Sequence, residues 1–217
     1  MTREWSELRN ALEELANAAR LVHAEVQARL GDVRSKLGLF HRFKTRCEWY
    51  DRERLARLAD EAKGSPENRL TAELALFLFD QGLNPLIRPR VANQEPDILD
   101  PSPQGRIYVE AKQYKDSEGA RENIRTGARQ IWAMLATLRG NKYEVQEAFF
   151  PVFRRGGPRY LLPKELRHDG FVMYPLLIDL APSSQSGSRL RENEIEIASE
   201  ALLPLPPELE DKPGPSV

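Results

Sequence analysis

Two acids and a lysine in the middle of the chain have the types and spacing of a site that could hydrolyse a phosphodiester. Asp97 follows Pro96, and Glu110 and Lys112 stand two residues apart further along the chain. Hydrolysis at neutral pH needs a cation to stabilise negative charge on the phosphoryl oxygens and a water placed to attack. Magnesium prefers oxygen ligands and is commonly held by one or two carboxylates, with waters and substrate completing its shell. The three residues are therefore candidates for a metal-dependent site.

Paired strands would bring these side chains together. Residues 96–100 and 106–114 have the apolar, β-branched and aromatic content of strands, with turn-forming residues between them. Strands joined by so short a link pair as a hairpin, which would place Asp97 near Glu110. Alternate strand residues share a face, so Glu110 and Lys112 would lie roughly 6–7 Å apart on the same side. Lys112 could then orient or deprotonate the attacking water and meet the phosphate charge.

The surrounding pattern predicts an α/β fold. Apolar residues change between the helix period and the strand period from residue 65 onward. The expected elements are a helix over 67–81, a strand over 86–91, the two strands above, a helix over about 118–138, and strands over 145–153 and 172–180. This order predicts a mixed sheet flanked by helices.

The N-terminal region has a different pattern. Apolar residues from Trp5 to Val33 recur at alternating steps of three and four, interrupted at Arg29, which predicts a helix with a heptad seam. A second helix is expected over about 40–62. The two helices could form a hairpin within one chain, since Gly38 permits the turn, or the seam could form a coiled coil and a homodimer. The pattern leaves both open.

These patterns divide the chain into three parts. Residues 1–64 are expected to form the helical hairpin or coiled coil, and residues 65–203 the sheet domain. Residues 204–217 are rich in proline and are expected to be a disordered tail.

The composition excludes several classes of protein. With 41% hydrophobic and 30% charged residues, the chain is expected to fold, and no apolar run approaches the roughly 18 residues of a membrane span. The N-terminus lacks the apolar core of a signal peptide. A single cysteine, Cys47, excludes an intrachain disulfide, so we expect a cytoplasmic location. The three histidines lie far apart, which argues against a zinc site.

The charge is unevenly distributed. The net charge is −1, but residues 86–168 contain 15 Lys or Arg against 10 Asp or Glu. Such a segment is compatible with a phosphate-binding face and equally with an ordinary solvated surface. Tyr114 and Lys115 could contact the phosphate backbone, and the turn that begins at Arg154 could carry its basic residues beside DNA.

Pro96-Asp97 followed by Glu110-Ala111-Lys112 resembles the signature of the PD-(D/E)xK nuclease superfamily. The continuation after Lys112 looks most like the Mrr-like restriction endonucleases. The resemblance covers roughly residues 66–155 and implies a restriction-endonuclease-like fold. It implies magnesium, for which manganese could substitute, held by Asp97, Glu110 and Ala111, with Lys112 as a catalytic residue.

The resemblance also implies two further site residues and a function. Glu73 matches a glutamate that the family often carries near the metal on the helix before the sheet, and Gln130 lies on the helix after it. The implied function is a metal-dependent endodeoxyribonuclease of restriction or phage defence, with DNA as partner and room for an activating partner. The residues leave RNA open as a substrate. Two alternatives remain: a nucleic-acid-binding module that does not cleave, and an assembly protein whose helical hairpin is the functional part.

Overall fold

The computed structural model describes residues 12–16, 18, 35–62, 64–103, 105–182 and 194–204. The chain divides into two compact units, residues 1–39 and residues 40–217. Most of the predicted heptad seam from Trp5 to Val33 lies outside the described residues, as does the predicted tail from residue 205 on. Within the described part of the seam, residues 12–16 are helical, and Leu12 and Leu15 are exposed.

The second unit is built on a mixed sheet of seven strands. Their order is β1-β2-β3-β5-β8-β7, and β4 pairs with β5 just beyond β3. The strands are β1 (Leu86–Ile87), β2 (Ile98–Asp100), β3 (Ile107–Val109), β4 (Lys112–Tyr114), β5 (Glu147–Arg154), β7 (Leu166–His168) and β8 (Phe171–Asp179). Strands β3, β4, β5 and β8 run parallel, and the edge strands pair antiparallel. A separate pair is formed by β6 (Arg159–Leu161) and β9 (Glu194–Glu196).

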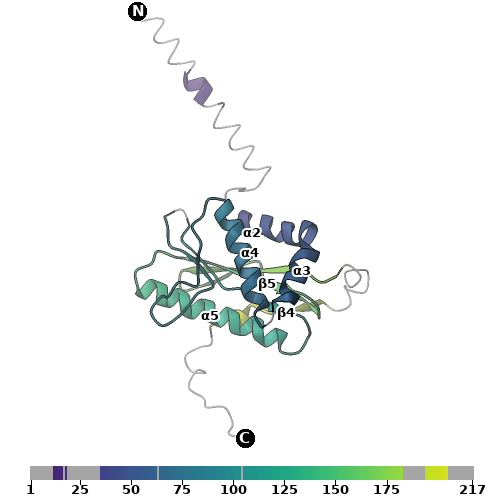
Figure 1. Ribbon diagram of the computed structural model, residues 1–217. Coiled ribbons are helices and arrows are strands. Elements are labelled where there is room, and N and C mark those ends of the chain that lie inside the picture. The colour runs from purple at the N-terminus through teal and green to yellow at the C-terminus, as the bar shows by residue number, and fades with distance from the viewer. Residues whose placement is uncertain are drawn as a thin grey trace, which may run out of the picture. The chain divides into compact units, whose positions relative to one another are not determined.

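Helices cover both faces of the sheet (Figure 1). Helix α5 (Ala120–Gly140) and the short 3-10 helix η4 (Ser199–Leu202) lie on one face. The other face packs against α2 (Lys36–Thr45) from Phe40 onward, the π-helix η1 (Arg46–Tyr50), α3 (Arg52–Glu61) and α4 (Pro66–Asp80). No helix among the described residues is long and apolar enough to cross a bilayer.

Strand β5 shows why the sheet needs helices on both sides. Phe150 and Val152 belong to the apolar core beneath α5. Phe149 points to the opposite face, where it stacks on Phe40 with ring centroids 3.9 Å apart, and Phe153 meets Phe43 edge-on. Strands buried on both faces are typical of parallel sheets. The helices from Phe40 to residue 61 therefore pack with the sheet, although the sequence pattern groups them with the N-terminal helix.

The long elements lie where the periodicity predicts them, and the short strands differ. The predicted strand over 86–91 ends at Ile87, because Arg88 adopts a left-handed φ of 49° that breaks the extended run. The predicted strand over 106–114 divides into β3 and β4. In the β2–β3 register Ile98 pairs with Val109, so Ala111 would lie opposite Pro96. The break in the strand falls at Glu110 and Ala111.

Candidate active site

The β2–β3 hairpin places the two acids side by side. Ile98 pairs with Val109 at this end of the ladder, and Asp97 and Glu110 are the next residues on the two segments. Asp97 Oδ2 accepts a hydrogen bond from the Ala111 N–H at 2.9 Å, so a side chain takes the place of a ladder bond at the break between β3 and β4. Asp97 and Glu110 are each only 8% exposed. Burial of two adjacent acids is costly unless other groups compensate.

Both oxygens of Glu110 are held by neighbours on the same face of the strand. Lys112 Nζ donates to Glu110 Oε1 at 2.7 Å, and the Tyr108 hydroxyl donates to Oε2 at 2.9 Å. Tyr108, Glu110 and Lys112 are alternate residues, as the strand period requires. Burial, and then the negative charge of Glu110, raise the pKa of the Tyr108 hydroxyl well above its usual value, so it remains a donor.

A second acid reaches Lys112 from α4. Glu67 Oε1 lies 3.6 Å from Lys112 Nζ. Glu67 is in the first turn of α4, directly after Pro66. Lys112 therefore has two carboxylate partners from different elements, Glu110 and Glu67. Asp97 is a third negative charge that acts on it.

The electrostatics follow from this crowding. Burial, reinforced by Asp97, raises the pKa of Glu110, while Lys112 works in the opposite direction. Burial likewise raises the pKa of Glu67 against the effect of Lys112. Burial alone would lower the pKa of Lys112, but Glu110 and Glu67 outweigh it and raise that pKa, so the side chain is an ammonium ion at neutral pH. The cluster holds more negative charge than one lysine can neutralise.

The structure does not bring Glu73 to this cluster. Glu73 pairs instead with Arg54 of α3, with Oε2 2.6 Å from Nη2 and Oε1 3.1 Å from Nη1. It lies six residues beyond Glu67, hence about 9 Å along α4 and about 240° around its axis. The two glutamates therefore face different neighbours.

The sequence contains a signal that identifies Glu67. It shares a helical face with three fully buried leucines, Leu70, Leu74 and Leu78, at steps of three and four. Glu73 is off that face. However, acids are common in the first turn of any helix because they interact favourably with the helix dipole. The position of Glu67 therefore does not stand out in the sequence.

Gln130 of α5 lies beside Glu110 without bonding to it. Both contribute to a hollow of about 350 Å³ between β3 and α5. Helix α5 can approach the strands closely because of Gly127, since a Cβ there would stand 2.8 Å from both Lys112 Cγ and Phe150 Cζ. The helix therefore forms one wall of the site.

The donor set fits magnesium better than zinc. Among the described residues no three His, Cys, Asp or Glu side chains are close enough to share a metal ion, which leaves the pair Asp97 and Glu110. Magnesium needs no more than one or two carboxylates, whereas a structural zinc site takes four nitrogen or sulfur ligands. Asp97 Oδ1 accepts no hydrogen bond from the described part of the chain, and the Glu110 oxygens keep spare lone pairs. An alanine such as Ala111 could contribute only its carbonyl oxygen.

Comparison with known proteins finds no match: no family model, no curated protein and no solved structure matches this chain. The structure by itself supports a mixed α/β fold around a seven-stranded sheet. Any narrower assignment depends on the residues at the break between β3 and β4.

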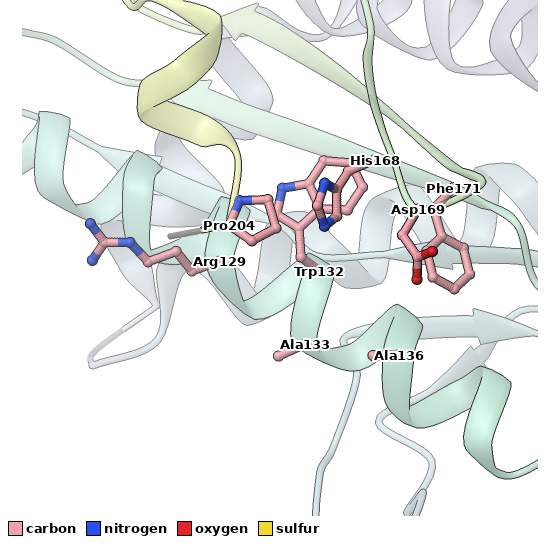
Figure 2. A pocket seen from close by; sticks show the side chains of 8 residues that line it. All are labelled: Arg129, Trp132, Ala133, Ala136, His168, Asp169, Phe171 and Pro204. Carbon is pink, nitrogen blue, oxygen red and sulfur yellow. The ribbon is translucent and has the colours of Figure 1, made fainter. Parts of the chain in front are cut away.

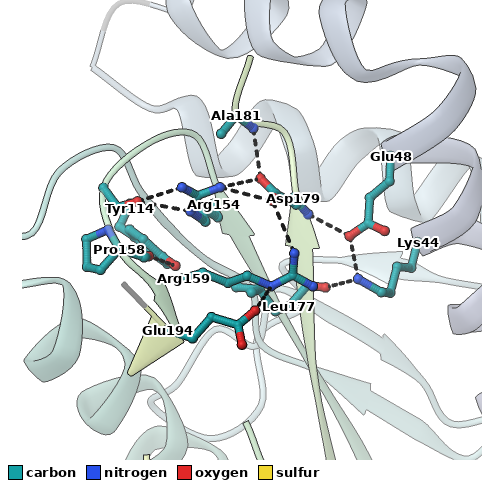
Figure 3. A network of polar contacts seen from close by, with 11 residues as sticks. Lys44, Glu48, Tyr114, Arg154, Pro158, Arg159, Leu177, Asp179, Ala181 and Glu194 are labelled. Carbon is teal, nitrogen blue, oxygen red and sulfur yellow. Dashed lines mark hydrogen bonds and ion pairs between the residues drawn. The ribbon is translucent and has the colours of Figure 1, made fainter. Parts of the chain in front are cut away.

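A second buried polar cluster has a structural explanation (Figure 3). Arg154, which is 1% exposed, binds both oxygens of Asp179 at 2.9 and 3.0 Å and donates to the Gly157 carbonyl oxygen through Nε and Nη2. Glu48 accepts the Asp179 N–H at 2.8 Å. The cluster ties the ends of β5 and β8 to η1. Arg154 is therefore not available to DNA, contrary to the expectation for its turn.

The two residues after the motif also have partners within the fold. Tyr114 is 5% exposed, and its hydroxyl donates to the Pro158 carbonyl oxygen at 2.9 Å. Lys115 is exposed and pairs with Asp60 at 3.0 Å. Lys115 remains open to a phosphate, whereas Tyr114 is a packing residue.

A further hollow, of about 360 Å³, lies where α5 meets β7 and Pro204 (Figure 2). The buried rings of Trp132 and Phe171 supply its apolar surface. The acid in its lining, Asp169, is paired with Arg139 at 2.7 Å. Asp169 is the one acid that the described residues bring to this lining, so the hollow offers no carboxylate pair.

Proposed function

We propose that this protein is a magnesium-dependent nuclease of the PD-(D/E)xK type that hydrolyses phosphodiester bonds of DNA. One observation carries the proposal: two buried carboxylates, Asp97 and Glu110, directly adjoin the last pair of the β2–β3 ladder, Ile98 and Val109, and the Lys112 ammonium is hydrogen-bonded to Glu110. A non-cleaving module would gain little from this arrangement, because the two buried carboxylates carry more negative charge than the single Lys112 ammonium neutralises, and their burial costs free energy.

Each side chain has a distinct part in the proposed reaction. Asp97 and Glu110, with the Ala111 carbonyl oxygen, would hold the magnesium ion, and manganese could substitute. The ion supplies charge stabilisation at the phosphoryl oxygen and a lower pKa for bound water. Lys112, being protonated, acts as a cation and hydrogen-bond donor toward the phosphate and the attacking water, rather than as a base in the resting state.

The reaction balances with these groups. The water oxygen forms a bond to phosphorus and gives its proton to Glu67 or to bulk water, while the bond to one ester oxygen breaks and that oxygen leaves with a proton from bulk water. Glu67 stands across Lys112 from Glu110 and can accept a proton or hydrogen bond from water near the lysine. Its raised pKa makes it a better proton acceptor than an ordinary surface glutamate.

From the resemblance we also propose the biological role, which is restriction or phage defence in the cytoplasm. Efficient cutting would then require an activating partner. A protein that needs such a partner would bind DNA and magnesium in isolation and cut slowly.

Incubation with nucleic acid and metal tests the function. The substrates are supercoiled, linear and single-stranded DNA, and RNA, each with magnesium, manganese or a chelator. We expect cleavage with metal and none with chelator. Asp97→Asn keeps an oxygen for the Ala111 N–H but loses the ligand charge, so it should lose activity by about 100-fold or more.

Glu144→Gln is the matched control, because Glu144 is a surface acid paired with Arg106 at 2.7 Å. It should cut as the parent does. Parental activity in Asp97→Asn would contradict the proposal, and DNA binding without cleavage in every metal would favour the non-cleaving module.

A further inference from the structure

The hollow beside Glu110 is built from three separate segments. Its volume is about 350 Å³. It is lined by the loop residues Gln94 and Glu95, the β3 residue Tyr108 with Glu110, and the α5 residues Gln130, Ala133 and Met134. Because Glu110 belongs to both, the hollow adjoins the proposed metal site.

The loop side of the hollow has a fixed backbone. Val91 and Gln94 exchange two hydrogen bonds, each N–H donating to the other's carbonyl oxygen at 3.0 Å. The turn between them includes Ala92 at a left-handed φ of 53°. Such a closed turn holds Gln94 and Glu95 at the edge of the hollow without a rearrangement when a ligand enters.

Three polar side chains of the hollow are available to a ligand. Gln94, Glu95 and Gln130 are exposed, and their side chains make no hydrogen bond or ion pair with the part of the chain that the structure describes. The two amides each offer a donor and an acceptor, and the carboxylate offers acceptors. Ala133 and Met134 add apolar surface next to them. Apolar walls with a few convergent polar groups are typical of small-ligand sites.

The charge of the hollow selects against a second phosphate. Two acids, Glu95 and Glu110, contribute to its lining, and no lysine or arginine among the described residues does. An uncharged ring with hydrogen-bonding edges fits this lining, whereas a phosphate would be repelled. The volume is at the lower end of the roughly 300–1,000 Å³ of ligand pockets, so it suits one base and excludes a stacked duplex.

We propose that this hollow binds the nucleobase next to the phosphate that is cut, and that the preferred substrate is therefore DNA with an unpaired or extruded base at that position. The proposal rests on the proposed function in taking nucleic acid as the substrate. A base inside a duplex cannot enter such a hollow until it is unstacked. Single-stranded, frayed or mismatched DNA is the substrate class that this geometry favours.

The polar groups also predict which bases bind. The Glu95 carboxylate accepts hydrogen bonds, and adenine, cytosine and guanine carry an exocyclic amino group that can donate to it. Thymine lacks that group, and its one donor on the open edge, N3–H, is flanked by two carbonyl oxygens that a carboxylate repels. We expect thymine to be the least favoured base in the hollow, by about tenfold, the lower part of the range for one well-placed side chain against a wrong base.

Mapping of cut positions tests the preference. Single-stranded DNA of mixed sequence is cut by the full-length protein in magnesium, and the ends are sequenced. The parent should avoid thymine at one position beside the cut. Gln94→Ala and Gln130→Ala should each cut more slowly, and Glu95→Gln, which removes the carboxylate that discriminates against thymine, should give a flatter base profile. Gln146→Ala, an exposed glutamine outside the hollow, should keep both the rate and the profile.

Equilibrium binding tests the hollow independently of cleavage. A short single-stranded oligonucleotide is titrated in calcium, beside the same oligonucleotide with one abasic position moved along it. The parent should lose affinity by about tenfold when the abasic position reaches the hollow. Gln94→Ala and Gln130→Ala should lose this position dependence, and Gln146→Ala should keep it.

The outcomes separate the two proposals. Metal-dependent cutting with a flat base profile in the parent, or equal binding of every abasic oligonucleotide, overturns the base pocket and leaves the nuclease. Position-dependent binding without any cutting supports the pocket and overturns the nuclease. A base profile that is unchanged in Glu95→Gln overturns the assignment to this hollow.

Discussion

The candidate site holds more negative charge than its environment compensates. Glu110 and Glu67 both have raised pKa values, with burial as the first cause, although Lys112 is bonded to one and lies 3.6 Å from the other. A fold selected for stability alone would replace such acids with apolar or neutral residues. The imbalance is what a cation would correct, so the electrostatics and the donor set support the same proposal.

Substitution of Glu67 should change stability and activity in opposite directions. Because its folded pKa is raised, its ionised form destabilises the fold, and the loss of stability appears as pH rises through that pKa. Glu67→Gln removes this charge. In chelator, its unfolding temperature should exceed that of the parent at neutral and higher pH, and the difference should vanish in acid. Thermal unfolding across a pH series measures this.

The same variant should cut about 10- to 100-fold more slowly, the usual range for a residue that supports a metal site. Glu73→Gln on the same helix is the comparison, because its partner is Arg54 and not Lys112. It should keep parental cleavage. A large activity loss in Glu73→Gln with none in Glu67→Gln would reverse the assignment made from the structure.

Lys112 should matter for turnover and not for metal binding. Lys112→Met keeps the apolar stem of the side chain and removes the ammonium that meets the phosphate charge. We expect cleavage to fall by about 100-fold, while calorimetric titration still detects metal binding. Weaker metal binding with unchanged turnover would contradict the role proposed for the lysine.

At the scale of elements, the sequence predicts what depends on local pattern. The spacing of Glu110 and Lys112 fixes their common face, and the short link after Asp100 fixes the hairpin. The Lys112–Glu110 bond and the nearness of Asp97 to this segment follow from that strand geometry. Helices α4 and α5 and strands β5 and β8 are long enough for their periodicity to be read.

What the sequence could not predict depends on packing between distant segments. The short strands β6 and β9 pair with each other from segments far apart in the chain, which no local pattern indicates. Whether Glu67 or Glu73 lies at the candidate site depends on which turn of α4 packs against Lys112. The family resemblance pointed to Glu73. The burial of Arg154 depends on Asp179 of β8, which is its partner in the β5–β8 register.

Two glycines of α5 test whether the close approach of this helix positions the site. At Gly127 a Cβ would stand 2.8 Å from Lys112 Cγ and Phe150 Cζ, whereas at Gly140 nothing lies within 4 Å. Gly127→Ala should lower stability by about 1–3 kcal/mol through overpacking and should lower cleavage by displacing Lys112. Gly140→Ala should be neutral or slightly stabilising. Denaturant unfolding and cleavage rates of both variants decide it, and equal behaviour would contradict the positioning role of α5.

At the scale of the whole molecule, the boundary between the two units decides how the N-terminal region can be studied. The second unit begins at Phe40, and Phe40 stacks directly on Phe149 of β5. Deletion of residues 1–64 would therefore remove helices that pack on the sheet. Any change in mass or activity could then come from a damaged core and not from loss of the N-terminal seam. Substitutions within the seam avoid that problem.

The seam predicts a dimer of the full chain. Leu12 and Leu15 belong to it, and they are 57% and 66% exposed. An apolar stripe of this length in water favours a partner, and a coiled coil between two chains provides one. Two sites on one particle could also cut both strands of a duplex. Light scattering at micromolar concentration should give about twice the chain mass of 24.8 kDa. The double variant Leu12→Glu, Leu15→Glu should give the monomer mass. It should still cut one strand of a duplex. A monomeric mass for the parent would defeat the dimer and leave the hairpin within one chain.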